Sequence, residues 1–308
     1  MSKIGIDAIS YYVPSIYLSI EELSKNRELD YEKLSKGLGL EKMAVADSNE
    51  DPSSFAANAL IDLFEKNNLN PKEIGRIYMG TESALDASKP SATYATDLVE
   101  QFLSPKFGER SLRNCDITDM TFACIGGVDA LQNTIDWISR NPGKKAIVVT
   151  SDLSKYELNS SGEYTQGAGA VALLISENPS IITIENQWGI ATKSENDFFK
   201  PRREVDMKTV VENVLDLAEE AGEKPRKAGL VERILDVLPL SSLKDNILFE
   251  SKTLKIHKDT PVFDGQFSNR CYSESVKQAF INFRAEAIRS GRYNPCLLYT
   301  SPSPRDRG

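Results

Sequence analysis

Residues 115–139 read CDITDMTFACIGGVDALQNTIDWIS, and this stretch indicates the fold class. We interpret 115–122 as a strand, and the glycines at 126–127 as the opening of a helix that continues to about Ser139. Lys145–Thr150 contains a continuous apolar run at 146–149, which is typical of a strand buried on both faces. A strand, a helix and a buried strand in succession predict a layered α/β architecture.

The segments on either side continue the alternation of strands and helices. Asp51 and Pro52 mark a helix start, because a carboxylate caps the first turn and proline suits the first helical position. Gly167 and Gly169 precede a strand instead of opening a helix, so they do not form a dinucleotide-binding loop. Further strands are expected over 4–12, 74–79 and 171–175, and further helices over 94–103, 207–218, 230–238 and 268–289.

The composition of the chain indicates a class of protein and excludes some kinds of binding site. The chain has 308 residues, a net charge of −8, and 40% hydrophobic and 27% charged residues, which is typical of a soluble globular protein. Its length corresponds to about two domains. The acidic balance and the lack of a long Lys/Arg run argue against a nucleic-acid partner. Four cysteines without metal-ligand spacing and one histidine, His257, argue against a metal site of several imidazoles.

The sequence carries no sign of secretion or of a membrane span. Its start lacks the apolar core of a signal peptide, and no run approaches the roughly 18 apolar residues of a spanning helix. We therefore expect a cytoplasmic protein with no membrane partner. In that compartment the four cysteines are expected to be reduced thiols.

Two residues follow predicted strands, at positions where α/β folds often have catalytic residues. Cys124 lies between a strand and a glycine-opened helix, where backbone N–H groups and the helix dipole would stabilise a thiolate and donate to an oxyanion. The alternative is a structural cysteine. Glu82 follows a predicted strand, where partial desolvation would raise its pKa for general acid/base work. The alternative is a solvated loop carboxylate.

Six stretches in order give the chain a specific resemblance to bacterial-type 3-hydroxy-3-methylglutaryl-CoA synthases, which are thiolase-fold condensing enzymes. It covers residues 1–201 and resumes over 261–284. It implies a thiolase-like layered α/β fold whose first half is near-complete and whose second half is truncated. The matching stretches are GID at 5–7, GTES at 80–83, ACxG at 123–126, DLSKY at 152–156, TQGAGAVA at 165–172 and DFFKP at 197–201.

The resemblance also implies a reaction. Cys124 would take the acetyl group of acetyl-CoA as an enzyme thioester, and Glu82 would remove a methyl proton and later protonate the new alkoxide. The carbanion equivalent would attack acetoacetyl-CoA, and water would release 3-hydroxy-3-methylglutaryl-CoA for the mevalonate route. No metal or redox cofactor is implied, and a homodimer is expected. The polar positions that the family places around the substrates match Thr165, Asp152, Asp86 and Asp197.

Departures from the family pattern leave two alternatives open. Ile125 stands where members commonly have an aromatic residue, and Tyr164 where bacterial relatives often have proline; both could reshape the acyl pocket. One alternative is a β-branching synthase that acts on carrier-protein-bound acyl groups in polyketide assembly. The other is a non-catalytic thiolase-fold partner subunit, against which the presence of both Cys124 and Glu82 argues.

The resemblance and the sequence patterns together divide the chain into a first half over 1–178, a connection over 179–202, a helical insertion over 203–258 and the start of a second half over 259–295. The family's substrate-binding histidine follows the Asp264-Gly265 motif, whereas His257 precedes it, so we expect the chain as given to turn over little. Residues 296–306 match the translation of a common transposase sequencing adapter, and we expect 296–308 to be foreign. A natural Ser/Pro-rich tail is the alternative.

Overall fold

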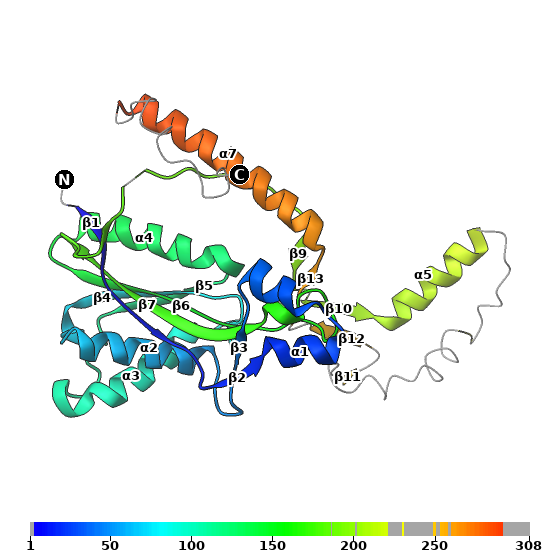
Figure 1. Cartoon of the computed structure of the whole chain (residues 1–308), viewed down its shortest axis with the longest axis horizontal. Coiled ribbons are helices and arrows are strands. Elements are labelled where there is room, and N and C mark those ends of the chain that lie inside the picture. Colours follow the sequence, from blue (N-terminus) through cyan, green and yellow to red (C-terminus); the bar gives the residue numbers. More distant parts are fainter. Residues whose placement is uncertain are drawn as a thin grey trace. The chain divides into compact units, whose positions relative to one another are not determined.

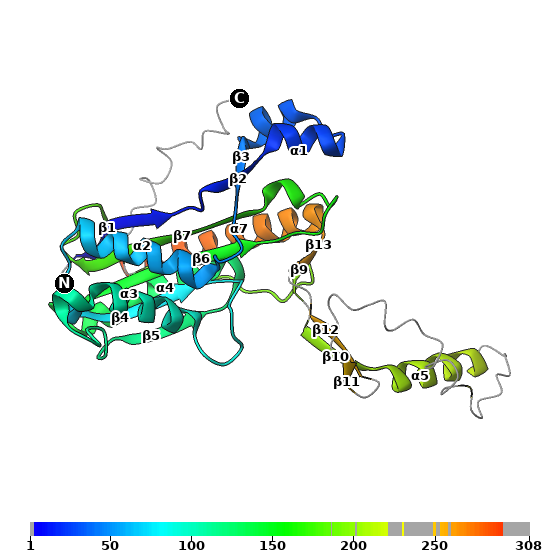
Figure 2. The ribbon, with the colours of Figure 1, turned by 90° about the horizontal axis from the view of Figure 1, so that it is seen from below.

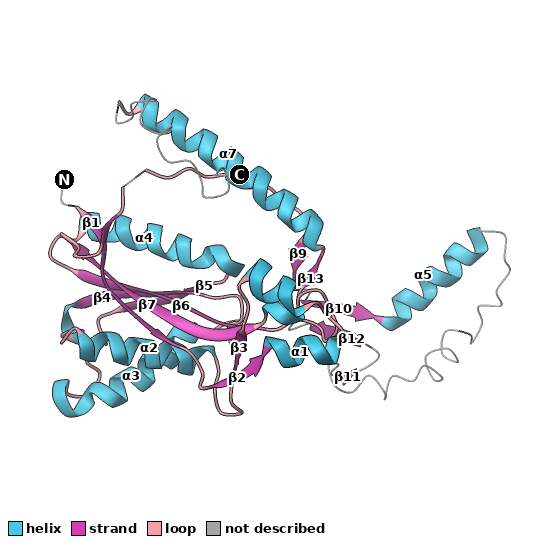
Figure 3. Cartoon of the chain, in the orientation of Figure 1, coloured by secondary structure: helices cyan, strands magenta, loops and turns pink. Residues whose placement is uncertain are grey.

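A six-stranded mixed sheet lies at the centre of the computed structural model, in the order β5-β4-β6-β7-β1-β8 (Figures 1 and 3). β4 pairs in parallel with β5 and β6, whereas β7 is antiparallel to β6 and β1. The strands are β1 (Ile4–Tyr12), β4 (Ile74–Gly80), β5 (Asp116–Met120), β6 (Lys145–Ser154), β7 (Gly167–Glu177) and β8 (Ile182–Thr183). The predicted strands are all present, and β6 and β7 extend beyond their predicted ends.

The structure describes residues 3–185, 187–200, 202–220, 230, 249–250, 253–257 and 260–291. The chain forms two compact units, one of residues 1–193 and 272–308 and one of residues 194–271. These boundaries differ from the predicted divisions after residues 178, 202 and 258. The predicted adapter translation and Cys296 lie outside the described residues.

Helices cover both faces of the sheet of the first unit, as the two views in Figures 1 and 2 show. α2 (Pro52–Lys66) and α3 (Ser91–Phe107) lie on one face, and α4 (Gly126–Arg140) lies on the other. Successive residues of β6 point to opposite faces of the sheet. Ile147 packs on the α2 side and Val148 on the α4 side, and both are fully buried. The layered α/β prediction is confirmed.

Local signals explain where the helices begin. Asp51 caps α2 through a capping box with Ser54, and Pro52 occupies the first turn, as predicted. The Asp119 carboxylate accepts the backbone N–H groups of Ser91 at 2.5 Å and of Ala92 at 2.9 Å, which begins α3 three residues before the predicted start. This cap comes from β5, so the sequence around α3 could not reveal it.

A small subassembly precedes α2, in a region for which the sequence patterns predicted no element. It consists of β2 (Ile16–Ser19), α1 (Ile20–Arg27), a π-helical turn (Lys33–Gly37) and β3 (Lys42–Val45). β2 and β3 pair in antiparallel fashion. Its buried core consists of Ile20, Leu23, Leu34 and Met43, and the partly buried Tyr164 packs against this core.

The second unit corrects the prediction that 203–258 is a helical insertion. α5 (Met207–Glu220) is present, but β10 (Arg202–Asp206), β12 (Thr253–His257) and β11 (Phe249–Glu250) form a three-stranded sheet. β10 and β12 pair across about fifty residues of chain, and short-range periodicity does not report such pairing. The predicted helix over 230–238 lies outside the described residues except for Leu230, which is helical.

The last described elements lie around the Asp264-Gly265 motif. β9 (Phe198–Phe199) pairs with β13 (Val262–Phe263), and α7 (Gly265–Arg289) follows. The Asp264 carboxylate accepts the N–H groups of Gln266 and Phe267 at 3.0 Å, so α7 begins three residues before the predicted start. Among the described residues, no helix combines the length and the apolar character that crossing a membrane requires.

Candidate active site

Parallel pairing brings the candidate residues to one edge of the sheet. Glu82 follows the end of β4, Cys124 follows the end of β5, and Asp152 lies in the last part of β6. Gly80 of β4 is in register with Met120 of β5 and with Thr150 of β6. Because parallel strands finish at the same edge, residues far apart in sequence meet there.

Close backbone approaches bring the start of α4 to this edge. A Cβ on Gly80 would lie 2.3 Å from Gly127 N, and a Cβ on Gly126 would lie 2.5 Å from Met120 O, so neither position accepts a side chain without a shift. Ala123 has a φ of 39°, in the left-handed region that is unfavourable for a residue with a side chain. The backbone therefore holds Cys124 in a strained turn between β5 and α4.

Asp152 organises the loop that carries Glu82. Its Oδ1 accepts from Thr81 Oγ1 at 3.0 Å, from the Glu82 backbone N at 2.8 Å and from Ser83 Oγ at 2.8 Å. The Thr81 side chain belongs to a fully buried residue. Ser154 Oγ, two residues further along β6, donates to Glu82 Oε1 at 3.3 Å. Asp152 was predicted to bind substrate, and the structure gives it contacts that position Glu82.

The electrostatics of Cys124 differ from the prediction. Cys124 is exposed at the surface, yet the protein atoms around its sulfur raise the pKa of the thiol by desolvation, and the charges of Glu82 and Asp152 raise it further. The backbone N–H of Cys124 itself lowers the pKa, but this is the smallest of the effects. The expected backbone stabilisation of a thiolate is therefore present but outweighed, first by desolvation and then by the charges of Glu82 and Asp152.

Tyr156 is a member of the site that sequence reasoning did not single out. Burial raises the pKa of its phenol, the charges of Glu82 and Cys124 raise it as well, and a side-chain hydrogen bond with Thr165 lowers it. Tyr156 and Thr165 therefore lie within electrostatic reach of the thiol and the carboxylate. The signal was present in the sequence, since Tyr156 closes the DLSKY stretch that begins at Asp152.

The hydrogen bonds of the other two predicted residues, Asp86 and Asp197, are made within their own parts of the chain. Asp86 accepts the backbone N–H groups of Ser88 at 2.7 Å and Lys89 at 2.9 Å, and these bonds lower the pKa of its carboxyl. It thus closes a turn in the loop before α3. Asp197 belongs to the second unit, where its carbonyl accepts the N–H of Asp264 at 3.1 Å.

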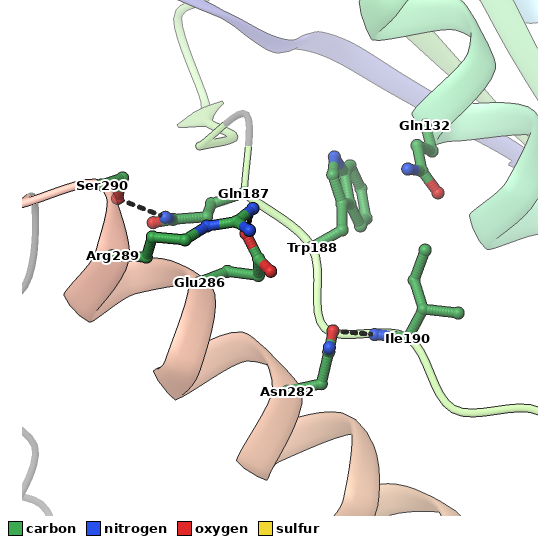
Figure 4. Close-up of a pocket in the computed structure, with 8 residues that line it drawn as sticks. All are labelled: Gln132, Gln187, Trp188, Ile190, Asn282, Glu286, Arg289 and Ser290. Carbon is green, nitrogen blue, oxygen red and sulfur yellow. Dashed lines mark hydrogen bonds and ion pairs between the residues drawn. The ribbon is translucent and has the colours of Figure 1, made fainter.

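A cavity of about 640 Å³ lies away from Cys124 and Glu82, between α4, the loop 187–190 and the residues of α7 in the first unit (Figure 4). Its lining is polar, and two hydrogen bonds bridge its wall: Asn282 Oδ1 accepts from Ile190 N at 3.1 Å, and Gln187 donates to Ser290 at 2.8 Å. Within the described ranges, no group of three or more potential metal ligands comes together.

Comparison with known proteins shows which family the chain belongs to. Residues 1–180 match the family model described as hydroxymethylglutaryl-coenzyme A synthase N terminal, which is more than half of the chain. The chain belongs to the hydroxymethylglutaryl-CoA synthase family. The predicted resemblance is thereby confirmed, and Cys124, Glu82 and Asp152 all lie within the matched residues.

Curated relatives in the family are enzymes of the same name. Hydroxymethylglutaryl-CoA synthase from Haloferax volcanii is 37% identical over 207 residues, which are 66% of this chain and 45% of the relative. The enzyme from Enterococcus faecalis is 36% identical over 200 residues, which are 64% of this chain and 49% of the relative. The chain therefore spans about half the length of these family members.

A solved structure of the family has the same fold. It is described as MvaS in complex with 3-hydroxy-3-methylglutaryl coenzyme A, and it superposes with a TM-score of 0.71 at 28% identity. The match covers 96% of this chain and 56% of that one. The likeness extends beyond the residues of the family model, into the second unit.

Proposed function

We propose that this chain carries the acyl-transfer residues of a 3-hydroxy-3-methylglutaryl-CoA synthase. The reaction condenses acetyl-CoA, acetoacetyl-CoA and water into 3-hydroxy-3-methylglutaryl-CoA and free CoA. One observation carries the proposal: a thiol and a carboxylate, Cys124 and Glu82, follow adjacent parallel strands and lie so close that the charge of Glu82 raises the pKa of Cys124. A nucleophile beside a base is the arrangement that covalent acyl transfer requires.

The first step forms the acetyl-enzyme. The Cys124 sulfur attacks the acetyl carbonyl, a carbon–sulfur bond to the enzyme forms, and CoA leaves as its thiol. Because the pKa of Cys124 is raised, the resting sulfur is protonated, and its proton has to leave as the bond forms. The Glu82 carboxylate is the neighbouring acceptor, and it passes this proton to the departing CoA sulfur, so that it is ionised again for the next step. The Gly126 N–H at the start of α4 donates to the Phe122 carbonyl at 3.0 Å, so the donor to the oxyanion has to be another backbone N–H of this turn.

The second step forms the new carbon–carbon bond. Glu82 takes a proton from the acetyl methyl group, and the resulting carbanion equivalent attacks the ketone carbon of acetoacetyl-CoA. The alkoxide that forms recovers a proton from Glu82, and water then cleaves the thioester to restore the thiol. The Ser154 hydrogen bond and the Asp152 bonds hold Glu82 in one orientation for both proton transfers.

Further features belong to the same proposal. The substrates are CoA thioesters, and a cysteine and a carboxylate supply the chemistry of acyl transfer, so we propose no metal or redox cofactor. The protein acts as a cytoplasmic homodimer in the mevalonate pathway, without a membrane or nucleic-acid partner. We propose that polar side chains around the substrates include Thr165, Asp152, Asp86 and Asp197.

Mass spectrometry of the acetyl-enzyme tests the proposal on the 308-residue chain. Incubation with acetyl-CoA should add one acetyl group to Cys124, and C124S should lose it, while C115S is the matched control and should keep it. Equal acetylation of C124S would refute the nucleophile. Acetylated acyl carrier protein, offered separately, distinguishes the β-branching alternative, since transfer from that donor alone would contradict a CoA-dependent synthase.

A further inference from the structure

An ion pair joins α1 to the loop that follows β6. Arg27 Nε donates to Glu163 Oε2 and Arg27 Nη2 donates to Glu163 Oε1, both at 2.8 Å. The side chain of Glu163 is only 6% exposed, and that of Arg27 is 28% exposed. A bidentate pair of this kind fixes orientation as well as distance, because both oxygens and both nitrogens are used.

The Glu163 carboxylate also organises its own loop. Its Oε2 accepts the backbone N–H of Asn159 at 2.9 Å, which closes the chain between these residues. The hydrogen bond from Arg27 lowers the pKa of Glu163, although burial opposes it, so the carboxylate is ionised at neutral pH. The next residue, Tyr164, packs on the core of the α1 subassembly. Two neighbouring residues therefore anchor this loop to α1.

The anchored loop in turn holds Tyr156 in place. A Cβ on Gly162 would lie 2.3 Å from Cδ1 of Tyr156, so the tyrosine ring rests directly on the glycine. The backbone N–H of Tyr156 donates to Gln166 Oε1 at 3.0 Å, and the Thr165 side chain bonds to the phenol. Tyr156 is thus held by three residues that flank Glu163. It stands two residues after Ser154, whose hydroxyl donates to Glu82 Oε1 at 3.3 Å, so it adjoins the site, in agreement with the charges of Glu82 and Cys124 that raise the pKa of its phenol.

We propose that Arg27 and Glu163 are positioning residues, whose ion pair sets Tyr156 against the Cys124–Glu82 pair. A buried ion pair contributes little net stability but demands a specific geometry, so its value here is the placement of the loop. Without the pair, the loop keeps its Tyr164 anchor but no longer fixes the phenol, and more water reaches the sulfur of the exposed Cys124. The inference rests on the proposed function for its catalytic meaning.

The pH profile of Cys124 alkylation by iodoacetamide, read from peptide masses, tests this role. E163Q keeps the shape of the side chain and removes its charge. It should lower the apparent pKa of Cys124 by about half a unit, because admitted water relieves the desolvation that raises it, and speed alkylation near neutral pH by about threefold. G162A should act likewise by displacing the Tyr156 ring. K36Q removes the exposed Lys36–Glu32 pair and should leave the profile unchanged.

A double-mutant cycle distinguishes this route from general loosening of the fold. In a Y156A background, which removes the ring, E163Q should cause no further shift in the Cys124 pKa. An equal shift in both backgrounds, or no shift in E163Q alone, would overturn the proposal. If E163Q folds poorly, G162A carries the same test, since it leaves the ion pair in place. Iodoacetamide alkylation requires no CoA thioester, so its outcome is independent of whether acetyl transfer occurs.

Discussion

The two ends of the parallel strands β4, β5 and β6 use charged residues in different ways. At their starts, Arg76 bonds to Asp116 at 2.9 Å and stacks on Tyr78, and Asp116 remains 51% exposed. At their C-terminal ends, Asp152 accepts three hydrogen bonds from the loop that carries Glu82. One aspartate pairs with a cation in solvent, and the other orients the backbone beside a thiol. The same side chain therefore forms an ion pair at one end of the strands and orients a loop at the other, according to the donors around it.

The largest expected effect separates the two aspartates. D152A removes the acceptor for three donors of the 81–83 loop, so Glu82 loses its fixed place and acetyl transfer to Cys124 should fall by about 100-fold. D116A removes a carboxylate at the other end of the strands and should change acetyl transfer by less than about twofold. Rates of acetyl incorporation, followed by intact mass, measure both. Similar losses in the two variants would break the comparison.

The two cysteines at the ends of β5 should differ next. Burial and the charge of Asp116 raise the pKa of Cys115 to about 12, so almost none of it is thiolate near pH 8. The pKa of Cys124 is raised as well, but this residue is exposed. Iodoacetamide should therefore label Cys124 at least about tenfold faster than Cys115.

The pH dependence of the same reaction gives the sign of the Cys124 shift. A raised pKa means that the thiolate fraction, and with it the labelling rate, keeps rising as pH increases past the value of an ordinary free thiol. A rate that levels off below that value would show a lowered pKa. Peptide mapping after limited labelling at several pH values provides the measurement.

A difference in stability is expected for the glycines at the two ends of β4. A Cβ on Gly80 would meet backbone, the Gly127 N at 2.3 Å, which cannot move without shifting α4. A Cβ on Gly75 would meet the far edge of the Trp137 ring at 2.5 Å, and a side chain can turn away. G80A should lower the free energy of unfolding by about 3 kcal/mol and G75A by about 1 kcal/mol. Urea denaturation measures both, and a larger loss in G75A would reverse the comparison.

Sequence reasoning located the parts of the site that depend on neighbouring residues. The apolar run in β6, the glycines that open α4 and the cap of α2 are local patterns, and the structure contains all three. The same reasoning placed Cys124 between a strand and a helix. It also placed Glu82 after a strand, although β4 ends two residues before it.

The features that were missed depend on pairing between distant segments. The helix start predicted a stabilised thiolate at Cys124, but desolvation and then the charges of Glu82 and Asp152, which come from distant parts of the sequence, raise its pKa. Arg27 and Glu163 are 136 residues apart, so no window of sequence contains both. The strands β10 and β12 of the second unit pair across about fifty residues, which is why a region with one clear amphipathic helix was expected to be helical throughout.

The register of β4 and β6 has a consequence for how this family can vary. Gly80 stands opposite Thr150, so Glu82 and Asp152 are each two residues beyond a matched pair. One residue inserted into β6 before Thr150 would advance the aspartate by a full step and turn its side chain to the opposite face of the sheet. The number of residues in β6 therefore fixes where Asp152 lies relative to Glu82. Insertions and deletions are tolerable only in the loops, which have no strand register to keep.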